Sequence, residues 1–144
     1  MIARRMALKG GLAGGLAVAA WPALATPREV EIEIAKLIGD KTLKPGHVTL
    51  DLAQMVENGN AVGVTVSATA PAGRTVASLH VFAEGNPNPE VLHAAFGPAS
   101  YAPKLATRMR LATSQTVVAV AMMDDGSCWS DSVSVIVTLA ACLE

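Results

Sequence analysis

Aromatic and charged residues are both scarce in this chain of 144 residues. Phe, Trp and Tyr make up 3% of the sequence and Asp, Glu, Lys and Arg 16%, whereas 51% of the residues are hydrophobic. The low charge excludes a disordered tail or a charged coiled coil. With so few aromatics, the core must consist mainly of Val, Leu, Ile, Ala and Met. The length suffices for one compact domain and is too short for two.

Basic residues are also few once the beginning of the chain is set aside. Residues 1–25 hold three of the eleven basic residues and none of the twelve acidic ones, which leaves eight against twelve in the remainder. A binder of nucleic-acid phosphates needs clustered Lys and Arg. The sequence therefore argues against that class of protein.

Motifs typical of enzymes and metal sites are missing. The sequence contains no C-x-x-C, no H-E-x-x-H, no G-x-S-x-G and no phosphate loop. Its three histidines, His47, His80 and His93, are scattered. His80 alternates with Leu79 and Val81, which predicts that it faces solvent or an interface. The residues alone predict a protein with no active site, metal or cofactor of its own.

The N-terminal segment 1–25 has the pattern of an export signal. The adjacent Arg4 and Arg5 precede an apolar stretch at 10–20 that is rich in Gly and Ala, and a small-x-small end reaches Ala25. Paired arginines are typical of the twin-arginine type, and the apolar stretch is shorter than the ~20 residues that span a bilayer. We expect cleavage after Ala25 and a periplasmic mature protein.

Residues 29–39 predict a short helix. Apolar residues recur there at helical spacing, acids fill the first turn, and Gly39 can end the helix. A strand is the alternative, because the sequence EVEIEI also alternates. The residues that form the apolar helix face are Val30, Ile34, Leu37 and Ile38.

Short segments with strand character follow, separated by turn residues such as Glu57–Asn60 and Asp124–Ser127. About seven strands at this spacing, with no βαβ alternation, predict an all-β fold. We expect one domain, residues 26–144, that is an antiparallel β-sandwich, immunoglobulin-like in shape, after the short helix. The predicted strands span 48–52, 62–66, 76–84, 91–96, 105–111, 116–123 and 129–139.

The two cysteines, Cys128 and Cys142, flank the last predicted strand. Fourteen extended residues span roughly 45 Å, whereas a disulfide needs Cα atoms about 5.5 Å apart, so an intrachain bridge is excluded. Cys128, beside a hairpin turn, is interpreted as a packing residue. Cys142 is a free thiol near the chain end, where chains are exposed unless tied down. An intermolecular disulfide and an incidental residue are its alternatives.

Several segments of the domain resemble a single protein family, the SoxY family of sulfur carriers in bacterial thiosulfate oxidation. The resemblance extends over nearly all of the chain after residue 50, and the export signal also fits it. The matching segments are 51–62, 64–66, 80–84, 86–89, 107–112, 114–117, 125–127, 129–130 and 137–139, the last leading to Cys142.

The resemblance implies an immunoglobulin-like β-sandwich that pairs with a SoxZ-like subunit in a heterodimer. It implies that sulfur intermediates are held covalently on Cys142, within a carrier tail at 140–144. The carrier presents them transiently to the haem enzyme SoxXA, to SoxB and to SoxCD. No cofactor of the carrier itself is implied.

The tail departs from the family pattern. Family members end in Gly-Gly-Cys-Gly-Gly, whereas this chain ends in Ala-Ala-Cys-Leu-Glu. Glycine frees the backbone and removes side-chain bulk, and Glu144 and the terminal carboxylate add negative charge near the thiol. Two functions remain open: a covalent sulfur carrier acting through Cys142, and a non-carrier interaction subunit that docks a SoxZ-like or other periplasmic partner.

Overall fold

The structure is a computed structural model that describes residues 26–100 and 102–142. The predicted signal at 1–25 and the last two residues of the predicted tail lie outside the described residues. Within the described part, no helix is long and apolar enough to cross a membrane. The elements are α1 (Pro27–Ile38), β1 (Leu43–Pro45), β2 (Val48–Leu52), β3 (Met55–Asn58), β4 (Val62–Ala68), β5 (Val76–Ala83), β6 (Glu90–Ala95), β7 (Lys104–Met109), β8 (Gln115–Met123) and β9 (Cys128–Leu139).

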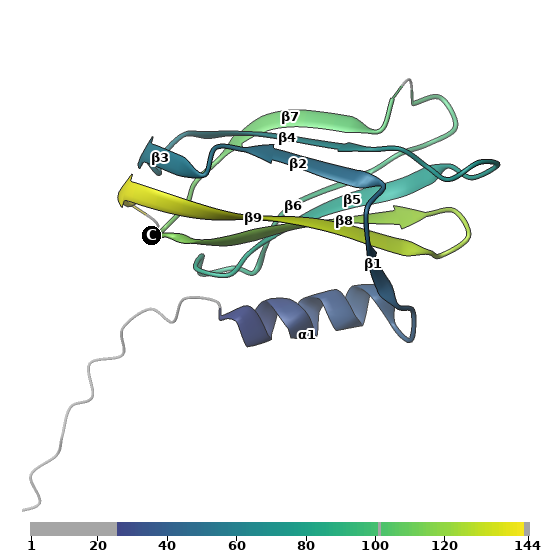
Figure 1. Cartoon of the computed structure of the whole chain (residues 1–144), viewed down its shortest axis with the longest axis horizontal. Helices are drawn as coiled ribbons and strands as arrows, with labels where there is room; N and C mark the ends of the chain where they lie inside the picture. Colours follow the sequence, from purple (N-terminus) through teal and green to yellow (C-terminus); the bar gives the residue numbers. More distant parts are fainter. Residues whose placement is uncertain (1–25, 101, 143–144) are drawn as a thin grey trace, which may run out of the picture.

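Two sheets pack face to face in a β-sandwich (Figure 1). The larger sheet has the order β1-β9-β8-β5-β6, with β3 also pairing with β9, and the smaller sheet has the order β2-β4-β7. Aliphatic side chains from both inner faces form the core, with no aromatic residue among its fully buried members. The predicted fold class, an immunoglobulin-like all-β sandwich with a short N-terminal helix, is confirmed.

The prediction of about seven strands misses two short ones. β1 and β3 both pair with β9, and both run parallel to it, along the edge that β8 leaves free. The chain therefore belongs to the larger sheet in β1, to the smaller sheet in β2 and to the larger sheet again in β3. It crosses between the two sheets twice along this edge of the sandwich. The predicted turn at 57–60 is shorter than expected, because β3 continues to Asn58.

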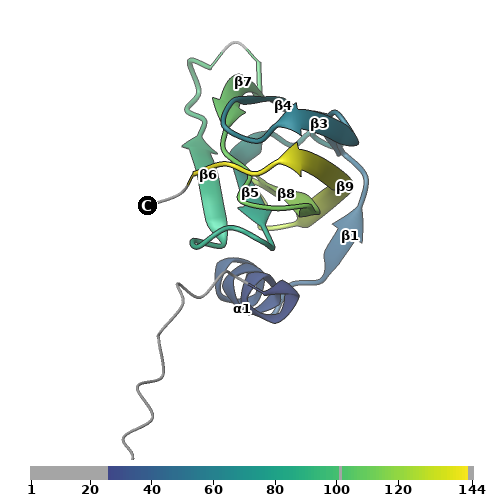
Figure 2. The ribbon, with the colours of Figure 1, turned by 90° about the vertical axis from the view of Figure 1, so that its left-hand side faces the viewer.

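The helix α1 packs on the outer face of the larger sheet (Figure 2). It begins with a capping box, in which the Thr26 side chain accepts a hydrogen bond from the Glu29 N–H and the Glu29 carboxylate accepts one from the Thr26 N–H. Val30 and Ile34 are buried against Phe82 and Val120 in a second, smaller core. The predicted helix therefore forms, and the strand alternative does not.

His80 was expected to face solvent or an interface, and the first of these alternatives is wrong. His80 lies on the face of β5 opposite Leu79, as its alternation predicts, but it is only 7% exposed. Its ring stacks on His93 of β6 with centroids 5.2 Å apart. Its Nδ1 lies 3.0 Å from Glu90 Oε1, and its Nε2 lies 2.9 Å from Ser78 Oγ. Neighbouring side chains of β5 and β6 therefore cover and satisfy this histidine.

Candidate functional site

Cys142, the predicted attachment residue, lies three residues beyond the end of β9. It is exposed, and neither it nor Cys128 forms a disulfide. Figure 2 views the end of the sandwich where β9 stops and the chain terminates. We call this the tail end, and the opposite end, where β8 turns into β9, the hairpin end. An exposed thiol at the tail end is open to a reagent or a second protein.

Backbone hydrogen bonds hold the tail root, residues 139–141, against the sandwich. The Gly59 N–H donates to the Leu139 carbonyl over 2.8 Å, and the Ala141 N–H donates to the Leu111 carbonyl over 3.0 Å. The Leu111 N–H in turn donates to the Gly59 carbonyl over 2.9 Å. Three segments distant in sequence are therefore joined where the tail leaves β9.

Two asparagine side chains extend this arrangement as far as Cys142. The Cys142 N–H donates to Asn60 Oδ1 over 3.2 Å. The Asn60 amide is itself oriented, because both its backbone N–H and its side-chain Nδ2 donate to Asn58 Oδ1 over 3.0 Å. The acceptor that meets the Cys142 backbone is thus fixed by its own neighbour.

Gly59, between these asparagines, has no space for a side chain. A Cβ at this position would lie 2.5 Å from the Leu111 carbonyl oxygen and 3.0 Å from the Ala141 nitrogen. Both of those atoms belong to the backbone, so neither is free to move aside without breaking the hydrogen bond that joins them. The close approach of the three segments therefore requires glycine.

Asn86 supports the segment that receives the tail. It is 5% exposed, and its Nδ2 donates to the Arg110 carbonyl over 2.8 Å. Its Oδ1 accepts from the Ala112 N–H over 2.9 Å and from Gln115 Nε2 over 3.0 Å. Leu111, the partner of the tail root, is thereby fixed on both sides.

Sequence reasoning missed Asn58, Gly59, Asn60 and Asn86 as residues of the site, because the first three were interpreted as part of a turn and Asn86 was given no role. One signal could have found them. They belong to the segments 51–62 and 86–89 that carry the family resemblance. Leu111 belongs to another of these segments, 107–112. A concentration of Asn and Gly in segments that define a family favours side-chain-to-backbone hydrogen bonding over a generic turn.

Exposed apolar side chains lie on β3 and near the end of β9. Met55 is 68% exposed, Ile136 57% and Leu139 60%. Met55 and Ile136 are register partners on β3 and β9, so their side chains lie next to each other. We call Met55 and Ile136 the tail-end patch, whereas Leu139, three positions further along β9, lies on the opposite face of the strand. Adjacent apolar side chains in solvent are typical of a surface that another protein covers.

Cys128, at the hairpin end, has a different environment. It is 1% exposed, and its thiol donates to the Gly126 carbonyl over 3.2 Å. Burial raises the pKa of this thiol, and the Asp125 carboxylate raises it further, against an opposing effect of Lys41. The interpretation of Cys128 as a packing residue is consistent with its position. A buried, protonated thiol is a poor nucleophile.

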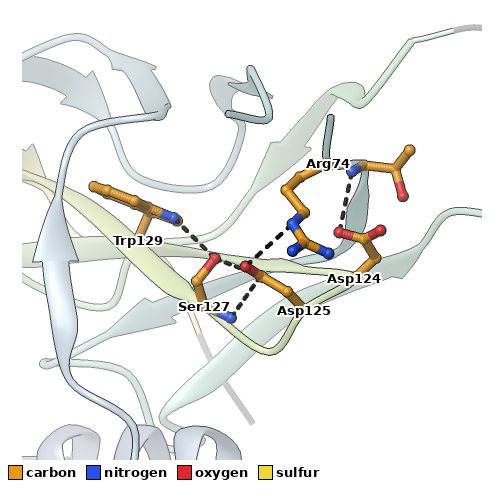
Figure 3. A network of polar contacts seen from close by, with 6 residues as sticks. Arg74, Asp124, Asp125, Ser127 and Trp129 are labelled. Atoms are coloured by element: carbon orange, nitrogen blue, oxygen red, sulfur yellow. Dashed lines mark hydrogen bonds and ion pairs between the residues drawn. The ribbon is translucent and has the colours of Figure 1, made fainter. Parts of the chain in front are cut away.

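Polar contacts hold the hairpin end together (Figure 3). Ser127 Oγ donates to Asp125 Oδ1 over 2.7 Å and accepts from Trp129 Nε1 over 3.3 Å. Arg74 Nε lies 3.5 Å from Asp125 Oδ2. The hydrogen bonds from Ser127, above all that of its side chain, hold the pKa of the Asp125 carboxyl below its usual range. The predicted turn at 124–127 is confirmed, with Gly126 at φ +82°.

A largely apolar cavity of about 820 Å³ also lies at the hairpin end. It lies between the end of β4, the start of β5 and the segment that joins β6 to β7. Val76 and Phe96 line it, and Arg74 and Asp124 contribute polar groups. Since Cys142 lies at the other end of β9, this cavity takes no part in the tail site.

The fold and the site define a class of protein: a β-sandwich that presents an exposed cysteine just beyond its last strand. Within the described residues, no group of three or more His, Cys, Asp or Glu side chains is arranged to hold a metal ion.

The family model described as "Sulfur oxidation protein SoxY" matches residues 34–142. The chain belongs to the SoxY family. It is a member of a family of sulfur-oxidation proteins, and the resemblance inferred from the sequence is confirmed.

Solved structures share the fold of this chain. The sulfur carrier protein SoxY from Chlorobium limicola f thiosulfatophilum superposes with a TM-score of 0.66 at 24% identity, over 78% of this chain and 98% of that one. A superoxide reductase (neelaredoxin) from Ignicoccus hospitalis gives a TM-score of 0.53 at 20% identity, over 79% of this chain and 94% of that one. No curated protein sequence matches this chain. Similarity at these identities shows a shared fold.

Proposed function

We propose that this protein carries sulfur intermediates as covalent adducts of Cys142 during thiosulfate oxidation. The observation that carries the proposal is the contrast between the two thiols. Cys142 is exposed beyond the last strand and Cys128 is buried with a raised pKa. In a family of sulfur-oxidation proteins, the accessible thiol at the chain end is the group that can accept and release a cargo.

The covalent step needs an electron acceptor. When the thiol forms an S–S bond to the sulfane sulfur of thiosulfate, the thiol releases its proton and the pair of reactants together gives up two electrons. The SoxY resemblance implies that a haem enzyme of the SoxXA type removes these electrons. SoxB-type and SoxCD-type enzymes then act on the bound group. The role of this chain is to hold the sulfur and present it.

We further propose that the protein works in the periplasm after twin-arginine export. The arginine pair and apolar stretch in 1–25 are the basis for this. Helix α1 begins at Pro27 with its cap at Thr26. Cleavage after Ala25 therefore leaves both the helix and its capping residue in the mature chain.

A SoxZ-like subunit is the proposed stable partner, because the family functions together with other Sox proteins. The tail-end patch of Met55 and Ile136 supports contact with a second protein at the end of the sandwich that holds Cys142. The same patch also fits the alternative function, a subunit that docks partners without covalent chemistry.

The test is the intact mass of the protein purified from the periplasm of cells growing on thiosulfate, with and without reductant. The wild-type chain is expected to show reductant-labile increments of sulfur or of a thiosulfonate group. Cys142→Ser should lose every increment. Cys128→Ser, the matched control, should retain them, since a serine hydroxyl can still donate to the Gly126 carbonyl.

An unmodified Cys142, or a dimer disulfide as its single modification, would contradict the carrier role. If Cys142→Ser then still supported growth on thiosulfate, the interaction subunit would be the correct interpretation. A chain recovered with residues 1–25 attached, in the cytoplasm, would overturn the proposed export.

A further inference from the structure

We propose that Asn58, Gly59 and Asn60 form a tail holder, which fixes the backbone up to the Cys142 N–H and presents the thiol from a defined position at the tail end. The proposal rests on the proposed carrier function and adds a positioning role for three residues. It implies that the backbone is held beyond the end of β9, as far as the Cys142 N–H.

The backbone part of the holder depends on Gly59. This residue donates to the Leu139 carbonyl and accepts from the Leu111 N–H, and the Leu111 carbonyl accepts from Ala141. These three bonds fix residues 139 and 141 on both sides of the departure point. Because a Cβ on Gly59 would lie 2.5 Å from the Leu111 oxygen, the contact is as close as a backbone permits.

The side-chain part depends on Asn60. Cys142 is exposed, so its N–H could be satisfied by water, and the fold does not require a protein acceptor there. The chain nevertheless supplies one in Asn60 Oδ1, at 3.2 Å. Asn58 Oδ1 accepts two hydrogen bonds from Asn60, which orients the amide so that its oxygen meets the tail. This is the geometry of a positioning residue.

The holder limits the reach of the thiol. If the arm began at Leu139, three further residues could extend it by roughly 10 Å. While the Cys142 N–H is bonded to Asn60 Oδ1, the sulfur atom moves by little more than the length of its own side chain. An enzyme that processes the adduct must therefore approach the tail end itself, where Met55, Ile136 and Leu139 are exposed.

The test is amide hydrogen exchange, measured residue by residue by NMR on the reduced, unloaded protein. In the wild-type protein, the amides of Ala141 and Cys142 should both exchange more slowly than in an unstructured peptide. Asn60→Ala should accelerate exchange at Cys142 by about two- to tenfold, the effect of one exposed hydrogen bond, and leave Ala141 unchanged. Asn60→Asp, whose carboxylate still accepts from the Cys142 N–H but cannot donate to Asn58 Oδ1, should restore the protection in part.

A matched control is Asn88→Ala, because the Asn88 side chain is exposed and forms no hydrogen bond within the described residues. It should alter neither amide. A second measurement is the ratio of Cys142 labelling rates with a polymer-linked and a small maleimide. That ratio should rise in Asn60→Ala, since a released tail admits a bulky reagent more easily.

An unprotected Cys142 amide in the wild-type protein would overturn the proposal, and so would an exchange rate that Asn60→Ala leaves unchanged. Protection at Ala141 shows in each variant that the fold is intact. The experiment involves no sulfur cargo, so its outcome is separate from that of the mass measurement. A held tail with an unmodified thiol would refute the carrier role and leave the holder in place.

Discussion

The two cysteines of this protein lie at opposite ends of one strand, and they differ in exposure to solvent. Cys128 begins β9 and Cys142 follows its end. At the hairpin end, side chains close over the thiol and burial raises its pKa. At the tail end, backbone hydrogen bonds and one amide side chain hold the chain while the thiol remains exposed.

The comparison teaches how a single strand separates a buried thiol from an exposed one. The twelve residues of β9 keep the two sulfur atoms too far apart to form a disulfide. In an oxidising compartment, two cysteines on flexible chain would pair and remove the reactive group. The rigid strand protects the free thiol without any dedicated side chain.

The largest expected effect is on thiol reactivity. In the native protein, iodoacetamide should modify Cys142 at least about a hundredfold faster than Cys128, because the buried thiol reacts only after the structure opens. Peptide mass spectrometry after timed quenching measures both rates. In concentrated denaturant the two rates should converge. Similar rates in the native protein would show that the hairpin end does not shield Cys128.

The next effect is on stability at the tail end. Gly59→Ala forces a Cβ to within 2.5 Å of the Leu111 oxygen and should lower the free energy of unfolding by about 1–3 kcal/mol. Urea denaturation followed by tryptophan fluorescence measures the change. The Ala141 amide should also lose its protection against hydrogen exchange in this variant.

The matched control for that variant is Gly63→Ala. Gly63 lies on β4, and a Cβ there would meet nothing within 4 Å. Stability should change by less than about 0.5 kcal/mol, as for other unstrained surface substitutions. Equal losses in the two variants would indicate a general sensitivity of the sandwich to alanine and would remove the special role of Gly59.

The smallest effect is on the pH dependence of stability. The Cys128 pKa is raised above the ordinary 9.0. Above pH 9 the unfolded chain therefore loses this proton while the folded chain keeps it, and stability falls as pH rises. Cys128→Ala should make the decline of stability above pH 9 shallower. Urea denaturation midpoints measured at several pH values above 9 test this prediction. An identical fall of the midpoint with pH in wild type and Cys128→Ala would contradict it.

The fold was predictable where local pattern and tertiary packing agree. Val48, Leu50 and Leu52 alternate in sequence and in burial along β2, and Val30 and Ile34 share the buried face of α1. β1 and β3 were missed because they have three and four residues and too few apolar positions to show a period. Their pairing is parallel and distant in sequence, and no local signal encodes it.

The site was predictable in part. The position of Cys142 after the last strand follows from the sequence, and its attachment role stays a prediction. His80 shows the opposite case: alternation gave the correct face of β5, yet residues from β6, ten and more positions away, determine that the ring is buried. Alternation predicts a side-chain direction but not what another strand places over it.

The sequence by itself determined the sandwich, the helix, the separation of the two thiols and the family, since each depends on local periodicity, strand length or motif residues. The tertiary structure alone decided what surrounds each thiol. Residues 58–60, 111 and 141 meet because β3 pairs with the end of β9 and the segment after β7 returns beside them. A contact between three distant segments is a property of how the strands pair, so only the folded chain reveals that the tail is held.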